Sequence, residues 1–197
     1  MSGIVIRSGS DETVATLAEV ADAPVINALT PGHHPCQALA DLLTLRERFG
    51  ALEGLRVAYV GDGNNVARSL ALLGGIAGVS VVVSSPKGYA LAGAPGAELV
   101  ADPSEAVAGA DAVYTDVWVS MGDDAEAEQR RAALRPYRVD GELLAGAAEG
   151  AIVLHCLPAH PGDEITAEVL YGPTSAVWDQ AENRLHAQKA LLEMLAG

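Results

Sequence analysis

The residues most able to do chemistry lie in one run, Asp116-Val117-Trp118-Val119-Ser120-Met121-Gly122. It follows an apolar stretch at 111–115 that is typical of a buried strand. A carboxylate, a hydroxyl and a Met-Gly turn therefore stand at the carboxyl end of a predicted strand, where parallel sheets present ligand groups. Asp116 could hold an ammonium group, and the N–H groups of the turn could hold a carboxylate, which together would suit an amino acid. An ordinary strand-to-helix turn with an N-cap would produce the same pattern.

A glycine-rich turn, Gly61-Asp62-Gly63-Asn64-Asn65, follows a second predicted strand at 56–60. It resembles the start of a dinucleotide-binding fingerprint, but Val66 stands where the third glycine is needed. The next strand ends in Ser84-Ser85-Pro86, with no acid to hold a ribose. The run therefore argues against NAD and favours either a plain tight turn or a ligand contact. In the second case the paired amides would bind a carboxylate or an amide without adding charge.

The segment His33-His34-Pro35-Cys36-Gln37 places polar groups at the start of a predicted helix, where unpaired N–H groups favour anions. His34 and Gln37 are three residues apart and share a helix face, so together they could contact a small polar substrate. No regular partner stands at ligand spacing, and we therefore predict no metal site here. Cys36 is interpreted as a small buried hydrophobic residue.

The segment His155-Cys156-Leu157-Pro158 ends a third predicted strand at 151–154. A nucleophilic thiol is conceivable there, but an adjacent His and Cys cannot fold back on each other to form the usual dyad. Cys156 is therefore interpreted as a group that positions an amine, or as a packed thiol. Arg184 begins the last predicted helix, and its closeness to a strand end makes an anion contact possible beside the ordinary interpretation as a solvated residue.

These groups require a scaffold that brings strand ends together. The chain has 197 residues, half of them hydrophobic, which is enough for a sizeable core. Short apolar strands alternate with helices, which predicts an α/β fold, a doubly wound and mostly parallel sheet flanked by helices. The predicted strands are 4–6, 24–29, 56–60, 79–83, 98–100, 111–115, 151–154 and 176–178. The predicted helices are 11–20, 35–49, one ending near 73, a short one from 102, and 123–135, 140–145, 164–170 and 182–195, of which 123–135 could also be a loop.

Composition excludes several classes of protein. The formal net charge of -14 disfavours nucleic acid, whose binding depends on Lys and Arg. No apolar run approaches the roughly 20 residues of a membrane helix, and the first residues lack signal-peptide organisation. We therefore expect a cytoplasmic protein that binds neither nucleic acid nor membrane. The two cysteines, far apart in sequence, do not indicate a disulfide framework.

Taken together, these motifs resemble those of the ornithine carbamoyltransferases. The matching segments, in the family's order, are His34-Pro35-Cys36-Gln37, 61–65, 116–122, 155–158 and 179–189. The serine-methionine-glycine run and the cysteine after His155 distinguish the chain from aspartate carbamoyltransferases. The resemblance covers nearly the whole chain, and it implies a Rossmann-like ornithine-binding domain with no cofactor and no metal.

The resemblance also implies a reaction, in which the side-chain amine of ornithine attacks carbamoyl phosphate to give citrulline and phosphate, a step of arginine biosynthesis. The residues that match the ornithine contacts are Asn65, Asp116, Ser120 and Met121 for the α-amino and α-carboxylate groups, with Cys156 and Leu157 near the reacting amine. The residues that match the carbamoyl phosphate contacts are Arg7, His34, Gln37 and Arg184, the first three near its carbonyl. Asp116, Cys156 and Arg184 are the expected catalytic residues.

One departure from the family is large. The phosphate loop Ser-x-Arg-Thr-Arg of the family's N-terminal carbamoyl phosphate domain does not occur in this sequence. We therefore interpret residues 1–29 as a remnant of that domain, 30–180 as the ornithine-binding domain, and 181–197 as a C-terminal helix that would pack back on the N-terminal domain. The chain is then a truncated or split carbamoyltransferase, with a separate N-terminal-domain chain as an expected partner and homo-oligomers typical of the full-length family. The alternatives are a non-catalytic amino-acid-binding or subunit-interaction module derived from the family, and a nicotinamide-dependent Rossmann protein.

Overall fold

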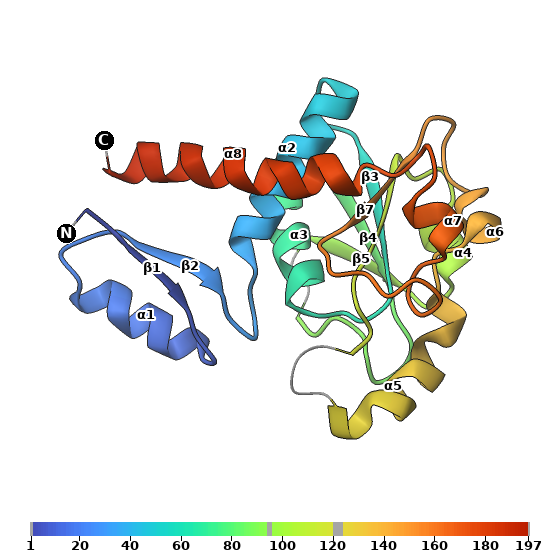
Figure 1. Ribbon diagram of the computed structural model, residues 1–197, viewed down its shortest axis with the longest axis horizontal. Coiled ribbons are helices and arrows are strands. Elements are labelled where there is room, and N and C mark those ends of the chain that lie inside the picture. Colours follow the sequence, from blue (N-terminus) through green and yellow to red (C-terminus); the bar gives the residue numbers. More distant parts are fainter. Residues whose placement is uncertain (1, 94–95, 120–123, 197) are drawn as a thin grey trace.

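A computed structural model describes residues 2–93, 96–119 and 124–196 and contains two sheets (Figure 1). The larger has five strands in the order β5-β4-β3-β6-β7, and every pairing in it is parallel. The smaller pairs β1 with β2, also in parallel, and carries α1. The strands are β1 Ile4–Arg7, β2 Val25–Leu29, β3 Arg56–Val60, β4 Ser80–Ser84, β5 Ala97–Val100, β6 Ala112–Thr115 and β7 Ile152–His155. The α-helices are α1 Asp11–Val20, α2 Pro35–Phe49, α3 Asn65–Ile76, α4 Pro103–Val107, α5 Ala127–Leu134, α6 Gly141–Leu144, α7 Ala167–Leu170 and α8 Val177–Ala196, with 3-10 turns at Asp124–Glu126 and Arg135–Tyr137.

The strand order creates a switch point between β3 and β6. From β3 the chain moves outward through β4 to β5, and it then returns to β6 and β7 on the other side. In such sheets the crevice outside the carboxyl ends of the two strands at the switch is where ligands bind. The turns that follow β3 and β6 are the glycine-rich turn at 61–65 and the run that begins at Asp116.

Alternation along the strands separates two hydrophobic cores. Tyr59 and Tyr114 face the side of the sheet covered by α2 and α3 and stack with ring centroids 5.4 Å apart. Their neighbours Ala58 and Val113 face the other side, which packs against α4 and α7. Helices on both faces are therefore required to bury these continuous apolar strands, which confirms the doubly wound fold.

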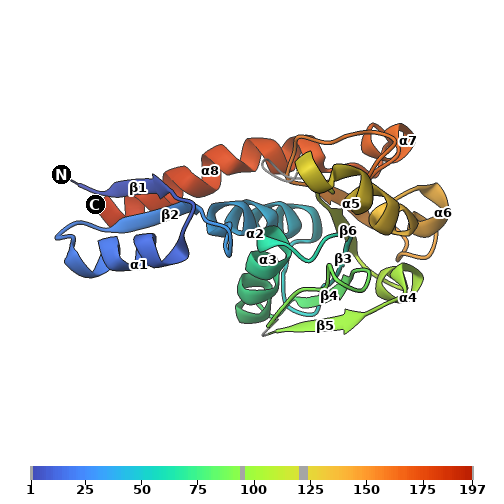
Figure 2. The same cartoon turned by 90° about the horizontal axis from the view of Figure 1, so that it is seen from below.

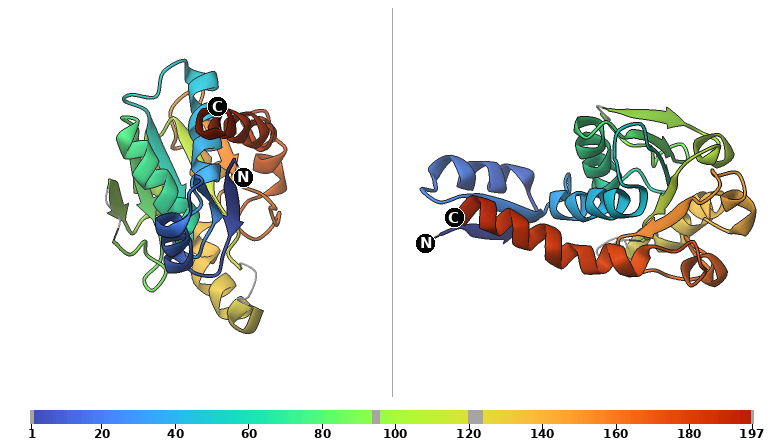
Figure 3. Two further views of the ribbon diagram at one scale, coloured as in Figure 1. Left: turned by 90° about the vertical axis from the view of Figure 1, so that its left-hand side faces the viewer. Right: turned by 90° about the horizontal axis from the view of Figure 1, so that it is seen from above.

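The two long helices α2 and α8 pack side by side (Figures 1 and 3). The predicted bounds of α2 are confirmed, with a proline in its first turn and Gly50, at φ +81°, at its end. Figure 2 shows α8 continuing past the larger sheet toward the two-stranded sheet, so that both chain ends lie at the same end of the molecule. No helix in the described part of the chain is long and apolar enough to span a membrane.

The predicted strand at 176–178 is wrong, because α8 already begins at Val177. The chain makes one isolated bridge to the sheet edge, in which the Ala176 N–H donates to the Val153 carbonyl at 2.9 Å. The Ala176 carbonyl then accepts from the Gln180 N–H, also at 2.9 Å, and the helix starts. Apolar β-branched residues suggested a strand, but Val177 is buried in the core as part of a helix.

The helix predicted at 164–170 is shorter in the structure. α7 contains only Ala167–Leu170, because Thr166 caps it and Ile165 pairs with Val139 in an isolated bridge. The local sequence pattern predicts a helix from residue 164, but the backbone bridge between Ile165 and Val139 keeps this segment extended and delays the start of α7.

Candidate functional site

Asp116 directly follows β6 at its carboxyl end, and its side chain is buried and accepts three hydrogen bonds. Its Oδ1 accepts from the Val117 N–H at 2.8 Å and from the Cys156 thiol at 2.9 Å. Its Oδ2 accepts from Asn64 Nδ2 at 2.7 Å. One carboxylate therefore joins the ends of β3, β6 and β7, and it carries a negative charge to the switch point.

The glycine-rich turn supplies the amide that contacts Asp116. Asn64 is the N-cap of α3, and its Oδ1 accepts from the N–H groups of Val66 and Ala67 at 3.0 and 3.2 Å. This cap directs its Nδ2 toward Asp116. Asn65, the residue predicted to contact ligand, donates instead to the Thr30 carbonyl at 2.8 Å and so ties the turn to the segment before α2.

Glycine is required in this turn for close approach. A Cβ on Gly63 would lie 2.3 Å from the Leu91 nitrogen, and Gly61 has φ +133°. These contacts explain the glycines without a dinucleotide, because backbone packing alone excludes a side chain there.

The end of β7 is held by a buried histidine. His155 Nδ1 accepts from the Leu157 N–H at 2.9 Å, and its Nε2 lies 3.3 Å from Glu164 Oε1. These two bonds select the Nε2–H tautomer. They also support Leu157, whose φ of +58° is unusual for a residue with a side chain. Cys156 is thus presented toward Asp116 by a backbone that its histidine neighbour fixes.

Cys156 is not a thiolate in this environment. Burial, the Asp116 charge and the Asp116 hydrogen bond together raise its pKa well above the ordinary value. A nucleophilic cysteine needs the opposite, a lowered pKa. The thiol therefore acts as a hydrogen-bond donor, which supports the prediction of a positioning or packed group.

Asp116, His155 and Cys156 also bring three possible metal-ligand atoms within 4.8 Å of one another. The sequence does not reveal this grouping, because adjacent residues on a strand normally point apart. Both ring nitrogens of His155 already have hydrogen-bond partners, so a bound ion would have to displace one of them.

A second group of polar side chains lies at the start of α2. Arg184 of α8 donates from Nη1 to Gln37 Oε1 at 2.7 Å, which unites two residues that the sequence places far apart. His34 occupies the N-cap position of α2 without a side-chain capping bond, and its backbone N–H donates to Ser69 Oγ at 2.7 Å. Burial, and then the charges of Arg184 and Arg7, lower the pKa of His34 to about 4. His34 is therefore a neutral imidazole under the influence of two cations, Arg184 and Arg7, and such a positive environment favours an anion.

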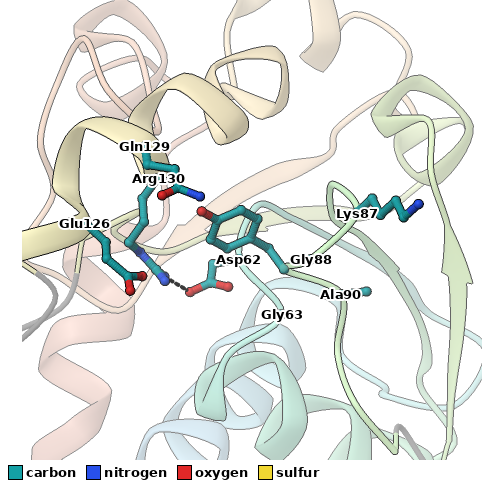
Figure 4. A pocket seen from close by; sticks show the side chains of 9 residues that line it. Asp62, Gly63, Lys87, Gly88, Ala90, Glu126, Gln129 and Arg130 are labelled. Atoms are coloured by element: carbon teal, nitrogen blue, oxygen red, sulfur yellow. Dashed lines mark hydrogen bonds and ion pairs between the residues drawn. The ribbon is translucent and has the colours of Figure 1, made fainter.

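A polar hollow of about 480 Å³ lies beside the switch point (Figure 4). Arg130 of α5 crosses it, makes an ion pair with Asp62, and donates from Nε to the Trp118 carbonyl at 2.6 Å. Its guanidinium also lies 5.1 Å from the centroid of the Tyr89 ring. Arg130 therefore braces the turn after β3 against the run after β6, two residues beyond Asp116. The sequence pattern does not reveal this arginine.

The structure thus places the predicted residues in two groups. Asp116, Cys156 and Leu157 lie at the ends of β6 and β7, while His34, Gln37, Arg184 and the exposed Arg7 lie around the start of α2. Asn65 lies between them. Ser120 and Met121 are outside the described residues. No sequence pattern indicated Asn64 as the partner of Asp116, or the burial of the carboxyl groups of Asp41 and Glu164.

The half-buried His34 and the fully buried Asp41 predict opposite effects of pH on stability. His34 titrates near 6.5 when unfolded but near 4 in the fold, so its contribution to the free energy of unfolding is lost as pH falls through that window. Burial raises the pKa of Asp41 from 3.8 to about 7, so stability falls as pH rises between those values. As the pH rises from 4 to 7, the free energy of unfolding of His34→Gln should fall relative to that of the parent, because the variant lacks the gain that His34 provides. That of Asp41→Asn should rise relative to the parent, because the variant lacks the loss that Asp41 causes. We expect each relative change to be roughly 2–4 kcal/mol.

Urea unfolding from pH 4 to 8 measures both slopes, with His186→Gln on the exposed side of α8 as the control for loss of an imidazole. Equal pH profiles for the three variants would contradict the prediction.

The fold and the site define an α/β protein with a buried carboxylate and neighbouring hydrogen-bond donors at the switch point of its sheet. Comparison with known families identifies it further. Residues 53–195 match the aspartate/ornithine carbamoyltransferase Asp/Orn binding domain, and residues 1–47 match the carbamoyl-P binding domain of the same family. The chain belongs to the aspartate/ornithine carbamoyltransferase family.

Individual relatives agree with this assignment. The ornithine carbamoyltransferase of Acidothermus cellulolyticus is 55% identical over 208 residues, which cover 99% of this chain and 67% of the relative. The crystal structure of the Thermus thermophilus enzyme matches with a TM-score of 0.91 at 49% identity, and the Pyrococcus furiosus enzyme with 0.93 at 47%. Each solved chain is covered over 67% of its length and this chain over 100%. The present chain therefore corresponds to about two thirds of these relatives.

Proposed function

We propose that this chain supplies the ornithine-binding part of an ornithine carbamoyltransferase, which makes citrulline and phosphate from ornithine and carbamoyl phosphate. The observation that carries the proposal is the buried Asp116 carboxylate, which bonds to Asn64 and Cys156 at the switch point of the sheet. A buried anion at this place suits the ammonium group of an amino acid. Identity of about 50% to relatives named for the reaction supports the choice of ornithine.

The proposed roles on the ornithine side follow the family pattern. Asp116 holds the α-amino group, and Asn65 with Ser120 and Met121 completes the contacts to the α-amino and α-carboxylate groups. Cys156 and Leu157 line the place of the reacting amine. The neutral thiol of Cys156 donates to Asp116, which keeps the carboxylate oriented and leaves the amine of ornithine as the nucleophile.

On the carbamoyl phosphate side, Arg7, His34, Gln37 and Arg184 are the proposed contacts. In the reaction a C–N bond forms between the neutral amine and the carbamoyl carbon and the C–O bond to phosphate breaks. The proton that the attacking nitrogen then gives up leaves with the phosphate. Donors near the carbonyl oxygen stabilise the negative charge that develops there. Arg184 and Arg7 supply permanent cations, and His34 remains neutral at pH 7.

Assembly and location extend the proposal. We place the ornithine-binding domain at 30–180, with 1–29 belonging to the carbamoyl phosphate domain and 181–197 packing against that domain. A second chain carrying the rest of the carbamoyl phosphate domain is the proposed partner, within a cytoplasmic homo-oligomer. The exposed side chains of Leu185 and Met194, 67% and 75% accessible on α8, are compatible with such packing.

Citrulline formation tests the proposal. The chain is assayed alone and mixed with a separately expressed carbamoyl phosphate domain that carries the phosphate loop absent from this sequence. We expect little turnover alone and turnover on mixing, because most of the phosphate ligands come from that loop. Normal turnover by the chain alone would contradict the split arrangement. Ornithine binding without turnover in any mixture would favour the non-catalytic module.

A further inference from the structure

A carboxyl group that the proposed reaction does not use lies at the centre of the contact between α2 and α8. Asp41 is 0% exposed, and its Oδ1 accepts three hydrogen bonds. The donors are Gln180 Nε2 at 2.6 Å, Gln37 Nε2 at 2.9 Å and the Tyr114 hydroxyl at 3.3 Å. A single oxygen atom therefore joins α2, α8 and β6.

This arrangement sets which end of each amide faces inward. A glutamine amide has a donor end and an acceptor end, and the two are interchangeable in shape. Because Gln37 and Gln180 both give their NH₂ groups to Asp41, both of their oxygens must face away from it. Oδ1 stays an acceptor whether Asp41 is ionised or carries a proton on Oδ2, so the orientation does not depend on its charge.

The outward-facing oxygens of Gln37 and Gln180 each accept a hydrogen bond from a different part of the proposed site. Gln37 Oε1 accepts from Arg184 Nη1 at 2.7 Å, which orients the proposed phosphate-side cation. Gln180 Oε1 accepts from the His155 N–H at 2.8 Å, at the end of the strand that presents Cys156. If either amide were rotated by half a turn, its oxygen would face Asp41 Oδ1, so that two acceptors would meet. Its NH₂ group would then face the N–H of Arg184 or of His155, so that two donors would meet.

We infer that Asp41 is a positioning residue, whose Oδ1 locks the amides of Gln37 and Gln180 and thereby holds Arg184 and the end of β7 in register with each other. The inference deepens the proposed function and depends on it for its catalytic consequence. The geometric part stands separately, because the hydrogen bonds concern the folded chain without substrate.

Kinetics of matched variants test the catalytic part, in the mixture that forms citrulline. Asp41→Leu keeps a similar size but removes the acceptor, whereas Asp41→Asn keeps an oxygen that can accept the same donors. We expect Asp41→Leu to raise the KM for carbamoyl phosphate at least tenfold and to lower kcat, and Asp41→Asn to remain within about threefold of the parent. Thr44→Val is the control, because it removes the Asn183–Thr44 bond one turn along the same helix contact without touching either glutamine. A folded Asp41→Leu variant with the kinetics of Thr44→Val would overturn the inference.

Hydrogen exchange of side-chain amides, followed by NMR on the unmodified chain, tests the geometric part without activity or substitution. We expect the NH₂ protons of Gln37 and Gln180 to exchange at least tenfold more slowly than those of the exposed Gln129. Exchange at the Gln129 rate would overturn the inference even if Asp41→Leu failed to fold. If the amide protons of Gln37 and Gln180 exchange slowly but no mixture makes citrulline, the hydrogen-bond network around Asp41 is supported and the proposed function is rejected.

Discussion

Asp116→Ala will reduce kcat/KM for ornithine by a factor of 100 or more in the citrulline-forming mixture. The carboxylate is the buried anion of the site, and removal of one partner of a buried charge pair costs about 2–5 kcal/mol. The change also leaves Asn64 Nδ2 and the Cys156 thiol without their acceptor, so the free energy of unfolding should fall by about 1–3 kcal/mol. Steady-state kinetics with ornithine varied, together with urea unfolding, separates the two effects.

Asp111→Asn is the matched control for Asp116→Ala. Asp111 directly precedes the other end of β6, where its Oδ2 accepts from the Arg56 N–H at 2.8 Å. Its loss of charge should leave the KM for ornithine within about threefold, because the residue lies a strand's length from the switch point. Equal loss of ornithine affinity in the two variants would mean that overall stability, rather than contact with substrate, explains the result.

A second readout for Asp116 does not depend on activity. The Asp116 charge, after burial, raises the pKa of Cys156, so Asp116→Asn should lower that pKa and speed alkylation of the thiol at pH 8. Cys36 is 2% exposed and should react slowly in both proteins. Unchanged alkylation of Cys156 would contradict the geometry described for the two side chains.

Arg184→Met will have an effect of similar size, on the other substrate. We expect kcat/KM for carbamoyl phosphate to fall by a factor of 100 or more, because a cation that stabilises the charge developing on a leaving phosphate contributes about 3–4 kcal/mol. The same variant should raise the pKa of His34 above its value of about 4, since the Arg184 charge is the second cause of that low value after burial. An NMR titration of the His34 ring measures this shift without any assay of turnover.

Lys189→Met is the control for Arg184→Met, because it removes one positive charge from an exposed position of the same helix. Its kinetics and the His34 titration should match those of the parent. A His34 pKa that stays equally low in Arg184→Met would mean that burial and the Arg7 charge account for it. Arg184 would then be too distant to share a ligand with His34.

Much of the architecture follows from local sequence. Most strands and helices from Ile4 to Leu154 lie within a few residues of their predicted bounds, because most have their own apolar period and a glycine, proline or capping residue at one end. In the described residues α5, expected over 123–135, is Ala127–Leu134 and has no side-chain cap. The strands at 56–60 and 111–115 carry chemistry-bearing residues directly after them, and parallel pairing places those ends at one edge. This is why the position of Asp116 suggested a ligand contact, with an ordinary strand-to-helix turn as the alternative.

Tertiary packing decided the contacts that no local pattern encodes. Arg184 and Gln37 are 147 residues apart in sequence and meet because α8 packs on α2. Asn64 rather than Asn65 contacts Asp116, because the helix cap fixes the direction of its side chain. Asp41 reads in the sequence as an ordinary polar position in a helix, and it becomes a shared acceptor only where α2, α8 and β6 converge.

By itself the sequence determined the class of fold, the family motifs and the edge of the sheet where they gather, because periodicity and turn residues act over a few neighbouring positions. The tertiary structure decided which polar atoms pair, and with them the neutral state of the Cys156 thiol and the low pKa of His34. Those properties depend on burial and on charges contributed by distant segments, and neither exists until the helices and strands have packed.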